Sequence, residues 1–300
     1  MNIYQEAMQP YPDLVNYATR FHLPKAGLDL FGFQTGNTSD PLVILVHGLG
    51  DDADTWRHII PELSKNFRVI AFDLPGFGRS DKPDVTYSVQ FFREVILELI
   101  ERIDRKPVTL IGHSLGAILT HAVTLSAPQE IKQLVLIAGG MAMKSQKLDS
   151  KTLFFLMPGI GEWLYNRLRK DPQAAYDTLK PYYSSLEDLP KEDRDFLFDR
   201  VNQRVWNNDQ RRGYFSTFRN LARWLPKQQS DLAAHLSGLN TPTLILWGET
   251  DRMNPVENGR YLAQIQPDTR LEVIPSAAHN LHQEQPEQVL AALQNFLDRS

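Results

Sequence analysis

Gly112-His113-Ser114-Leu115-Gly116 is the stretch of this sequence that decides its fold. It follows the apolar run 107–111, which indicates a buried strand, and it precedes the apolar run 117–123, which indicates a buried helix. A Gly-x-Ser-x-Gly between strand and helix predicts a very tight turn that lifts the serine above a sheet edge. Glycines flank the serine at a distance of two because larger side chains there would collide with neighbouring backbone. The turn also places Ser114 at a helix N-terminus, where free N–H groups favour negative charge.

Bulk composition limits the classes of protein that the chain can belong to. Its 300 residues suffice for one large α/β domain with an insertion, or for two domains. With 42% hydrophobic and 23% charged residues, it has the composition of an ordinary globular protein. The net charge of −4 gives no electrostatic reason to expect a nucleic-acid partner or an anionic membrane. The lack of cysteine excludes disulfides and thiolate catalysis.

Two further features bear on location. Residues 1–20 lack the basic start and apolar core of a secretory signal. No stretch reaches the roughly 18 apolar residues of a membrane span. We therefore expect a cytoplasmic protein without a membrane span, and nothing in the sequence requires a cofactor.

Short apolar runs alternate with helical patterns along most of the chain. Strands are indicated at residues 28–34, 42–46, 67–72, 107–111, 131–138, 243–247 and 271–274. Helices are indicated at residues 55–64, 89–103, 117–123, 256–265 and 286–297. This alternation predicts an α/β fold with a mostly parallel, doubly wound sheet and helices on both faces. For the first of these strands, at residues 28–34, an antiparallel direction is an alternative.

The alternation breaks between residues 141 and 229. This segment has no comparable strand run and is rich in charged and aromatic residues. The sequence therefore predicts a core domain made of residues 1–140 and 230–300, with a helical cap, or lid, inserted at 141–229. Such a lid favours a hydrophobic pocket between itself and the core. Among the aromatic residues of the cap, Trp163, Trp206 and Phe215 are the candidate substrate-binding residues.

A serine needs a base to become a nucleophile at neutral pH, and the base needs an orienting acid. In an open α/β sheet the site lies at the carboxyl ends of the strands. Asp251 follows the predicted strand at 243–247, and His279 follows the one at 271–274. Ser114, Asp251 and His279 therefore have the required chain order of nucleophile, acid and base. We expect His279 to act as general base and then as general acid, with Asp251 orienting its ring.

Several alternatives compete with this assignment. His282 is a second candidate for the base, and the pair His279 and His282 has the spacing of two metal ligands, although no third ligand is suggested. Glu249 and Asp231 are rivals of the proposed acid. We interpret His121, which lies on the predicted buried helix, as a core histidine.

An acyl-transfer site also needs donors for the developing oxyanion. One donor is expected to be the backbone N–H of Leu115, directly after the nucleophile. The other should come from the loop His47-Gly48-Leu49-Gly50, with the N–H of Leu49 as the first choice and that of Gly50 as the alternative. We interpret His47 as structural, bonded to loop backbone, with a catalytic role as its alternative.

Five motifs together resemble the α/β-hydrolase family. They are His47-Gly48, the loop Asp73-Leu74-Pro75-Gly76-Phe77-Gly78-Arg79-Ser80, the turn at Ser114, Trp247-Gly248-x-x-Asp251, and His279. The resemblance covers nearly the whole chain outside the insertion. It implies a hydrolase with a covalent acyl-enzyme and a lid. One departure from the family is Ala117, where many members have a third glycine.

The resemblance also narrows the branch of the family. Serine at position 114 argues against the haloalkane dehalogenases and epoxide hydrolases, which use aspartate there. The form Gly-His-Ser-Leu-Gly is most similar to carboxylesterases and lipases. C–C bond hydrolases of aromatic meta-cleavage products are compatible as well, although many of them have an aromatic residue where this chain has Asn280.

The sequence thus predicts a serine hydrolase that cleaves carboxylic esters of small to medium hydrophobic substrates. Two alternatives stay open. One is a C–C bond hydrolase of meta-cleavage products, and the other is a slow ligand-binding or signalling protein on a hydrolase scaffold.

Overall fold

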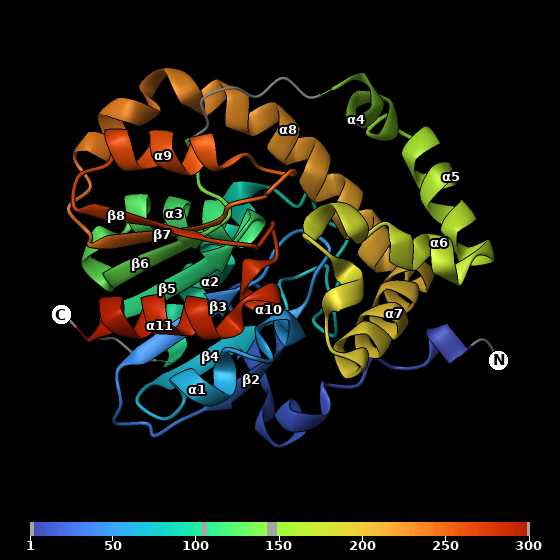
Figure 1. Ribbon diagram of the computed structural model, residues 1–300, viewed down its shortest axis with the longest axis horizontal. Coiled ribbons are helices and arrows are strands. Elements are labelled where there is room, and N and C mark those ends of the chain that lie inside the picture. Colours follow the sequence, from blue (N-terminus) through green and yellow to red (C-terminus); the bar gives the residue numbers. More distant parts are fainter. Residues whose placement is uncertain (1–2, 104–106, 143–148, 299–300) are drawn as a thin grey trace.

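One eight-stranded sheet organises the computed structural model, which describes residues 3–103, 107–142 and 149–298 (Figure 1). In spatial order the strands are β1 (Ala18–Leu23), β2 (Leu28–Thr35), β4 (Arg68–Phe72), β3 (Leu42–Val46), β5 (Val108–His113), β6 (Ile131–Ile137), β7 (Thr243–Gly248) and β8 (Thr269–Ile274). β2 pairs antiparallel with β1 and with β4, and all the other pairs are parallel. The predicted α/β fold with a mostly parallel sheet is confirmed.

Helices cover both faces of this sheet. The helices are α1 (Ile60–Leu63), α2 (Val89–Ile103), α3 (Leu115–Ser126), α4 (Ser150–Phe155), α5 (Ile160–Arg167), α6 (Pro172–Asp177), α7 (Lys191–Trp206), α8 (Asn208–Ser237), α9 (Val256–Ile265), α10 (Leu281–Glu284) and α11 (Pro286–Leu297). Helices α2, α3 and α9 pack on one face, and α1, α10 and α11 pack on the other.

The alternation of side chains along each strand produces the two cores. In β3, Ile44 and Val46 point into the core under α2 and α3, while Val43 and Leu45 point into the core under α11. Successive strand residues face opposite sides of a sheet, so a strand that is buried on both faces is apolar throughout. This is why β3 is apolar at every position.

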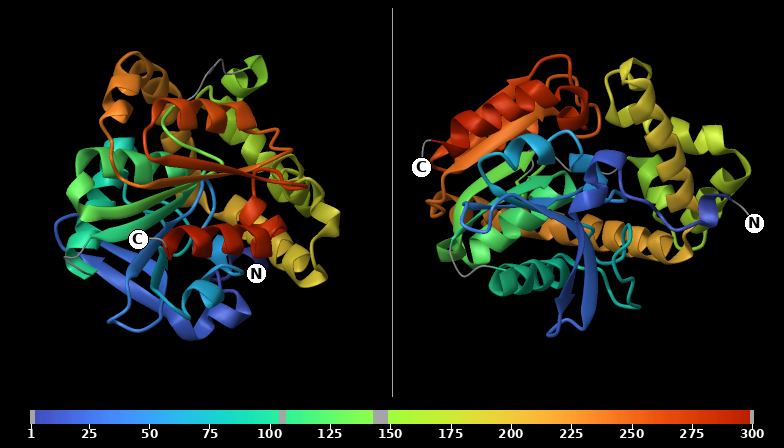
Figure 2. Two further views of the ribbon diagram at one scale, coloured as in Figure 1. Left: turned by 60° about the vertical axis from the view of Figure 1, so that its left-hand side comes forward. Right: turned by 90° about the horizontal axis from the view of Figure 1, so that it is seen from below.

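A series of helices separates β6 from β7, in the region where the sequence predicts a cap at residues 141–229. Figures 1 and 2 show α4 to α7 gathered to one side of the sheet and its covering helices. Within the described residues, this stretch between β6 and β7 contains only helices and irregular structure. No helix of the described chain is both long and apolar enough to cross a bilayer.

The predicted end of the insertion at residue 229 falls inside a continuous helix. Helix α8 runs from the cap to Ser237, and its later residues Leu225, Leu232 and Leu236 join the core on the α2 face. The boundary therefore lies within α8 rather than between two elements. An apolar stripe that packs against α2 and α9 carries the helix past the predicted boundary, with Pro226 inside it.

Other differences have local causes. The helix expected at 55–64 is split into a 3-10 turn, Ala53–Trp56, and the short α1. Pro61 cannot continue a preceding helix, and it occupies the first turn of α1, where its missing N–H costs nothing. Strand β1 was not predicted, because as an edge strand it alternates exposed and half-buried residues and has no apolar run.

Candidate active site

The tight turn at Ser114 joins β5 to α3, as the motif predicts. The serine has φ 53° and ψ −112°, a strained conformation for a residue with a side chain. A Cβ on Gly112 would lie 2.3 Å from the carbonyl oxygen of Gly116, and a Cβ on Gly116 would lie 2.1 Å from that of Val46. Both glycines are therefore required, because any side chain there would overlap backbone that cannot move away.

Three side chains from separate loops meet at this turn. The Oγ of Ser114 lies 2.9 Å from Nε2 of His279, and Nδ1 of His279 lies 2.8 Å from Oδ2 of Asp251. Asp251 follows β7 and His279 follows β8, so parallel strands bring all three to one sheet edge. The His279 side chain is almost fully buried, with 4% of the residue exposed.

The Asp251 carboxylate is held in one orientation. Its Oδ1 accepts hydrogen bonds from the backbone N–H of Met253 at 2.9 Å and of Asn254 at 2.8 Å. Its Oδ2 therefore faces the histidine, and because a carboxylate only accepts, Nδ1 of His279 carries the proton. Nε2 is then left with a free lone pair for the Ser114 hydroxyl proton, which is the tautomer that a general base needs.

The loop after β3 lies against the nucleophile. A Cβ on Gly48 would come within 3.3 Å of the Ser114 Cβ and 3.0 Å of the His113 ring, which is tighter than side chains usually pack. Leu49 lines the cavity above the serine, and Leu115 begins α3. The N–H of a first helical residue has no partner within its helix. The two backbone groups expected as oxyanion donors thus belong to segments on either side of Ser114.

The rival histidines have other partners. Nε2 of His282 is hydrogen-bonded to Thr55 Oγ1 at 2.9 Å, and burial holds the pKa of His282 well below its usual value. His47 accepts from the backbone N–H of Leu74 at 2.8 Å and donates from Nδ1 to the Gly48 carbonyl at 2.8 Å, so its ring braces loop backbone. His121 is buried on α3, and burial lowers its pKa to about 4.

The two rival acids lie apart from this arrangement, and the metal-ligand pair considered from the sequence gains no third ligand among the described residues. Glu249 is exposed and accepts from the backbone of Ser276, and Asp231 is exposed on α8. Among the described residues, no group of three or more His, Cys, Asp or Glu could hold a metal ion.

His113 is a part of the site that the sequence analysis did not single out. Its Nε2–H donates to the backbone carbonyl of His279 at 3.0 Å, and its ring centroid lies 5.0 Å from that of His279 and 4.5 Å from that of His282. Burial holds the pKa of His113 well below its usual value, so the ring is neutral. The only available signal was its position directly before the nucleophile.

A cavity of about 370 Å³ opens above Ser114, between the core and the cap. We call it the serine cavity. Its cap wall consists of Phe155, Leu164, Tyr165, Leu168, Thr178, Leu179, Tyr182, Tyr183, Leu197, Val201, Arg204 and Tyr214. Burial raises the pKa of Tyr165 to about 12 and that of Tyr214 well above its usual value, so both hydroxyls stay neutral. The wall is therefore mainly apolar and aromatic.

None of the three aromatic residues chosen from the sequence is among the residues that line the serine cavity. Trp163 is 57% exposed, under the guanidinium of Arg167. Phe215 is 1% exposed and packs behind Tyr165 and Tyr214, which do line the cavity. Composition identified an aromatic cap, but which face of each helix turns inward depends on tertiary packing.

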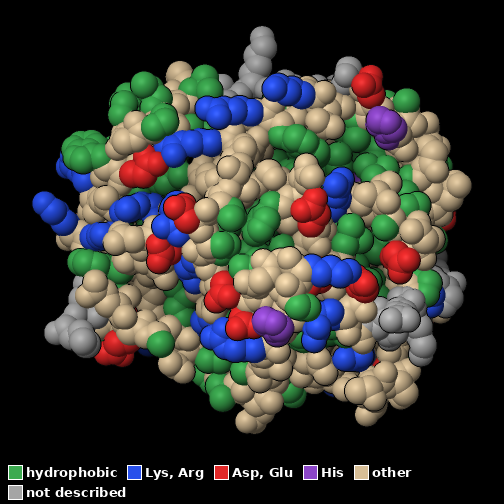
Figure 3. All heavy atoms as spheres, turned by 180° about the vertical axis from the view of Figure 1, so that it is seen from behind, with side chains coloured by type: hydrophobic (Ala, Val, Ile, Leu, Met, Phe, Trp, Pro, Cys, Tyr) green, Lys and Arg blue, Asp and Glu red, His purple; other side chains and the backbone are tan. Residues whose placement is uncertain are grey.

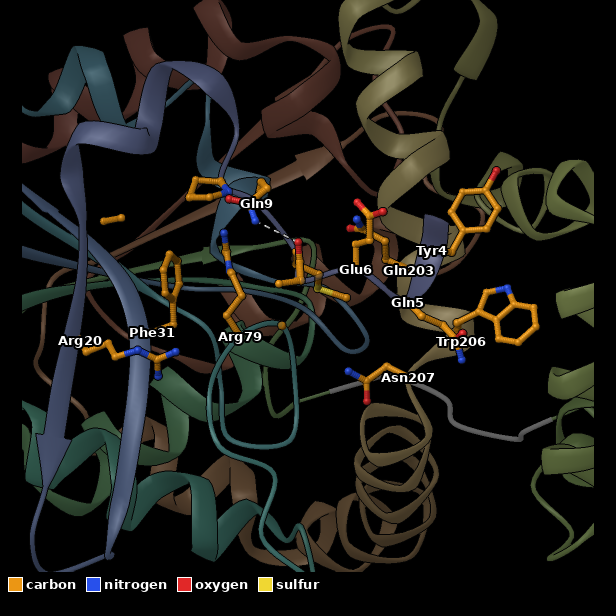
Figure 4. A pocket seen from close by; sticks show the side chains of 15 residues that line it. Tyr4, Gln5, Glu6, Gln9, Arg20, Phe31, Arg79, Gln203, Trp206 and Asn207 are labelled. Carbon is orange, nitrogen blue, oxygen red and sulfur yellow. Dashed lines mark hydrogen bonds between the residues drawn. The ribbon is translucent and has the colours of Figure 1, made fainter. Parts of the chain in front are cut away.

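Trp206 lines a different cavity of about 720 Å³, which we call the N-terminal cavity. Figure 4 shows it between the first residues of the chain, including Tyr4, and the junction of α7 and α8 at Asn207. Its lining contains none of Ser114, Asp251 and His279.

The serine cavity has little free charge. Asp51 and Arg204 are the only acidic and basic side chains among its lining residues, apart from histidines. They form an ion pair with each other, and Arg204 also donates to Asp52 at 2.9 Å. Within the described residues, the cavity thus offers no unpaired cation to an anionic substrate.

Comparison with known proteins shows the family. The alpha/beta hydrolase fold family matches residues 41–286, and the chain belongs to this family. A relative from Escherichia coli O81 (strain ED1a), a 2-hydroxy-6-oxononadienedioate/2-hydroxy-6-oxononatrienedioate hydrolase, is 29% identical, with 89% of this chain and 91% of the relative covered.

Solved structures show the same fold. The 2-hydroxy-6-oxo-6-phenylhexa-2,4-dienoate hydrolase of Rhodococcus sp. strain RHA1 superposes with a TM-score of 0.78 at 22% identity, covering 94% of this chain and 98% of the other. A bacterial membrane phospholipase A superposes with a TM-score of 0.75 at 23% identity, covering 94% and 85%. The fold is thus shared with proteins whose names state different activities.

Proposed function

We propose that this protein is a serine hydrolase that cleaves carboxylic esters with small to medium, uncharged hydrophobic groups. The observation that carries the proposal is the unbroken hydrogen-bonded series from Ser114 through His279 to Asp251. It lies at the floor of a cavity whose cap wall is mainly apolar and aromatic and whose Asp51 and Arg204 side chains pair with each other.

In the first half of the reaction, the Ser114 Oγ attacks the ester carbonyl carbon while its proton passes to Nε2 of His279. The carbonyl oxygen becomes an oxyanion, for which the N–H groups of Leu49 and Leu115 are the proposed donors. Nε2 then gives its proton to the leaving alcohol oxygen as the ester C–O bond breaks. An acyl group remains on Ser114.

In the second half, water replaces the alcohol. Nε2 of His279 takes a proton from the water as its oxygen attacks the acyl carbon. The bond to Ser114 then breaks, the proton returns to Oγ, and the carboxylic acid leaves. Asp251 stays ionised throughout and stabilises the imidazolium that forms twice.

In this proposal, residues 141–229 act as a cap that sets the size of the acyl or alcohol group. A volume of about 370 Å³ lies near the small end of the usual range for ligand pockets. Leu179, Leu197 and Val201 belong to the apolar part of its cap wall. Tyr182, whose ring centroid lies 5.7 Å from that of His279, stands beside the reacting groups.

C–C bond hydrolysis is the second candidate. The names of the Escherichia coli relative and of the Rhodococcus structure favour it, and a serine triad is compatible with both reactions. Those names describe dioate and dienoate substrates, which carry carboxylates. Because Asp51 and Asp52 already neutralise Arg204, the serine cavity suits an uncharged ester better.

The test compares p-nitrophenyl acetate, butyrate and octanoate with a dienoate C–C substrate, using wild type and Ser114→Ala. We expect ester turnover that Ser114→Ala abolishes, together with wild-type labelling by a fluorophosphonate. Ser126→Ala, at the far end of α3, is the matched control. Equal ester rates for wild type and Ser114→Ala would refute the proposal. Dienoate turnover that exceeds ester turnover by orders of magnitude would favour the second candidate, and single-turnover labelling without steady-state hydrolysis would favour a ligand-binding role.

A further inference from the structure

Two arginines of the cap, one buried and one partly buried, contact the chain directly after the proposed oxyanion loop. They are Arg200 and Arg204, one turn apart on α7. Arg204 Nη2 donates to Oδ2 of Asp52 at 2.9 Å and also to Oδ1 of Asp51. Arg200 lies 3.6 Å from Asp52 and 3.5 Å from Asp54. The cap therefore holds the acidic segment 51–54, which begins two residues after Leu49.

The same segment is anchored from the core side. Asp54 Oδ1 accepts from the backbone N–H of Tyr11 at 2.5 Å, and its Oδ2 accepts from Arg79. Arg79 also binds Asp73 at 2.9 Å. Asp52 accepts from the N–H of Asp54 at 3.2 Å, which caps the 3-10 turn that follows. Segment 51–54 is thus clamped between a core arginine and two cap arginines.

The carboxylates of segment 51–54 depend on the two cap arginines for compensating positive charge. Four carboxylates, those of Asp51, Asp52, Asp54 and Asp73, face the three guanidiniums of Arg79, Arg200 and Arg204. Burial raises the pKa of Asp52, but the Arg200 and Arg204 guanidiniums outweigh it and hold that pKa well below its usual value. Loss of Arg204 would take the paired cation from the half-buried Asp51 carboxylate and leave the buried Asp52 carboxylate with Arg200 at 3.6 Å, which destabilises this segment locally.

The described contacts of the oxyanion loop hold mainly its start, where the His47 ring is hydrogen-bonded to the Gly48 carbonyl at 2.8 Å. Gly48 and Gly50 flank Leu49, and Gly50 has φ 76°, which glycine adopts without strain. The loop is closed by a single backbone bond of 3.3 Å, from the Asp51 N–H to the Gly48 carbonyl. Two glycines allow many backbone orientations, so the direction of the Leu49 N–H depends on anchors outside the loop.

From these contacts we infer that Arg204 is a positioning residue for the oxyanion hole. By holding Asp51 and Asp52, Arg204 fixes the backbone directly after the loop 47–50. This sets the direction in which the Leu49 N–H points toward the developing oxyanion. The inference deepens the proposed function and rests on it. It makes catalysis depend on a docked cap, although α7 contributes no group that reacts.

A purely structural or substrate-binding role predicts different kinetics. Arg204 lines the serine cavity, so a lost substrate contact would raise KM and leave kcat unchanged. A misaimed oxyanion donor lowers kcat, because the donor acts most strongly in the transition state. Loss of a whole donor costs about 10²- to 10³-fold in kcat, so a displaced one should cost about 10- to 100-fold.

The experiment compares wild type, Arg204→Gln, Arg204→Lys, Asp51→Asn and Arg204→Gln/Asp51→Asn on p-nitrophenyl butyrate. We expect Arg204→Gln to lower kcat about 10- to 100-fold with less than about a threefold change in KM. Lysine keeps the positive charge but has a shorter side chain without the rigid guanidinium plane, so Arg204→Lys should recover only part of the loss. The double variant should be no slower than Arg204→Gln alone, because both changes break one contact.

Arg167→Gln is the matched control, because Arg167 is exposed on the same cap and lies over Trp163. It should leave kcat unchanged. A separate readout is hydrogen exchange of the peptide that spans residues 47–56, which should be faster in Arg204→Gln than in wild type. Asp51→Asn keeps the Arg204 bond to Asp52, so it should stay folded if Arg204→Gln does not.

The outcomes separate the inference from the proposed function. If wild type hydrolyses the ester and Arg204→Gln changes only KM, or leaves loop exchange unaltered, the positioning role is wrong while the esterase proposal stands. If wild type and Ser114→Ala have equal ester rates, the proposed function fails and the inference falls with it.

Discussion

Asp251→Asn is the change that tests the catalytic arrangement most sharply, because it alters one atom and leaves the shape of the site. Oδ1 of Asp251 accepts two backbone N–H groups, from Met253 and Asn254. An asparagine would keep its carbonyl oxygen on these two donors and turn its NH2 group toward His279. Flipping the amide would place NH2 against both donors, at a cost of about 1–3 kcal/mol for each unsatisfied buried group.

The expected result is the wrong tautomer of the base. An NH2 group donates, so Nδ1 of His279 would have to accept and the proton would move to Nε2. Nε2 then has no lone pair for the Ser114 proton. In Ser-His-Asp sites this change lowers kcat by about 10⁴-fold, which is about 5.5 kcal/mol of transition-state stabilisation.

The assay is steady-state hydrolysis of p-nitrophenyl butyrate, with thermal unfolding measured in parallel. Asp251→Asn should unfold near the wild-type temperature, since both backbone bonds are kept. Asp251→Ala should be less stable by about 2–6 kcal/mol, because it leaves both of those N–H groups without an acceptor. Glu249→Gln, two residues away on the exposed loop, is the control and should behave as wild type. An Asp251→Asn protein that keeps more than about a tenth of wild-type kcat would refute the reasoning.

Three further changes test separate features. Gly116→Ala places a Cβ 2.1 Å from the Val46 carbonyl oxygen, so the free energy of unfolding in urea should fall by about 3 kcal/mol or more, and an unchanged value would contradict the steric argument. Burial lowers the pKa of His121 from 6.5 to about 4, so below pH 6.5 the unfolded chain binds a proton that the folded chain does not. As the pH is lowered from 6.5 to 4, this residue should therefore reduce the free energy of unfolding by about 1.4 kcal/mol per pH unit. His121→Gln should lose less stability than wild type between urea titrations at pH 7.5 and 5.0. An equal loss in both proteins would exclude this role of His121. Val201→Phe narrows the serine cavity and should lower kcat/KM for the octanoate about tenfold more than for the acetate, whereas an equal loss for both would place the acyl chain elsewhere.

The elements that the sequence predicted most accurately are those with a strong local pattern. Helices α2, α9 and α11 have the predicted bounds, and β3 does as well. Edge strand β1 has no apolar run and was missed, and α8 passes the predicted cap boundary because its apolar stripe continues onto α2 and α9. Local periodicity reports which face of an element is buried, but not what lies against it.

In the candidate site too, local patterns predicted some residues and gave no indication of others. Chain order and strand ends pointed to Ser114, Asp251 and His279, because parallel strands bring their carboxyl ends to one edge whatever the details of packing. The His113 bond to the His279 carbonyl joins residues 166 positions apart, and no spacing rule points to it.

The sequence by itself therefore determined the sheet, the nucleophile turn and the three residues that meet there. Each depends on a repeating apolar pattern or on glycines beside a strained serine. Tertiary structure alone decided which cap residues line the serine cavity and that Arg204 pairs with Asp51 and Asp52. Those contacts depend on the rotation of each cap helix and on its distance from the sheet, which many distant side chains set together.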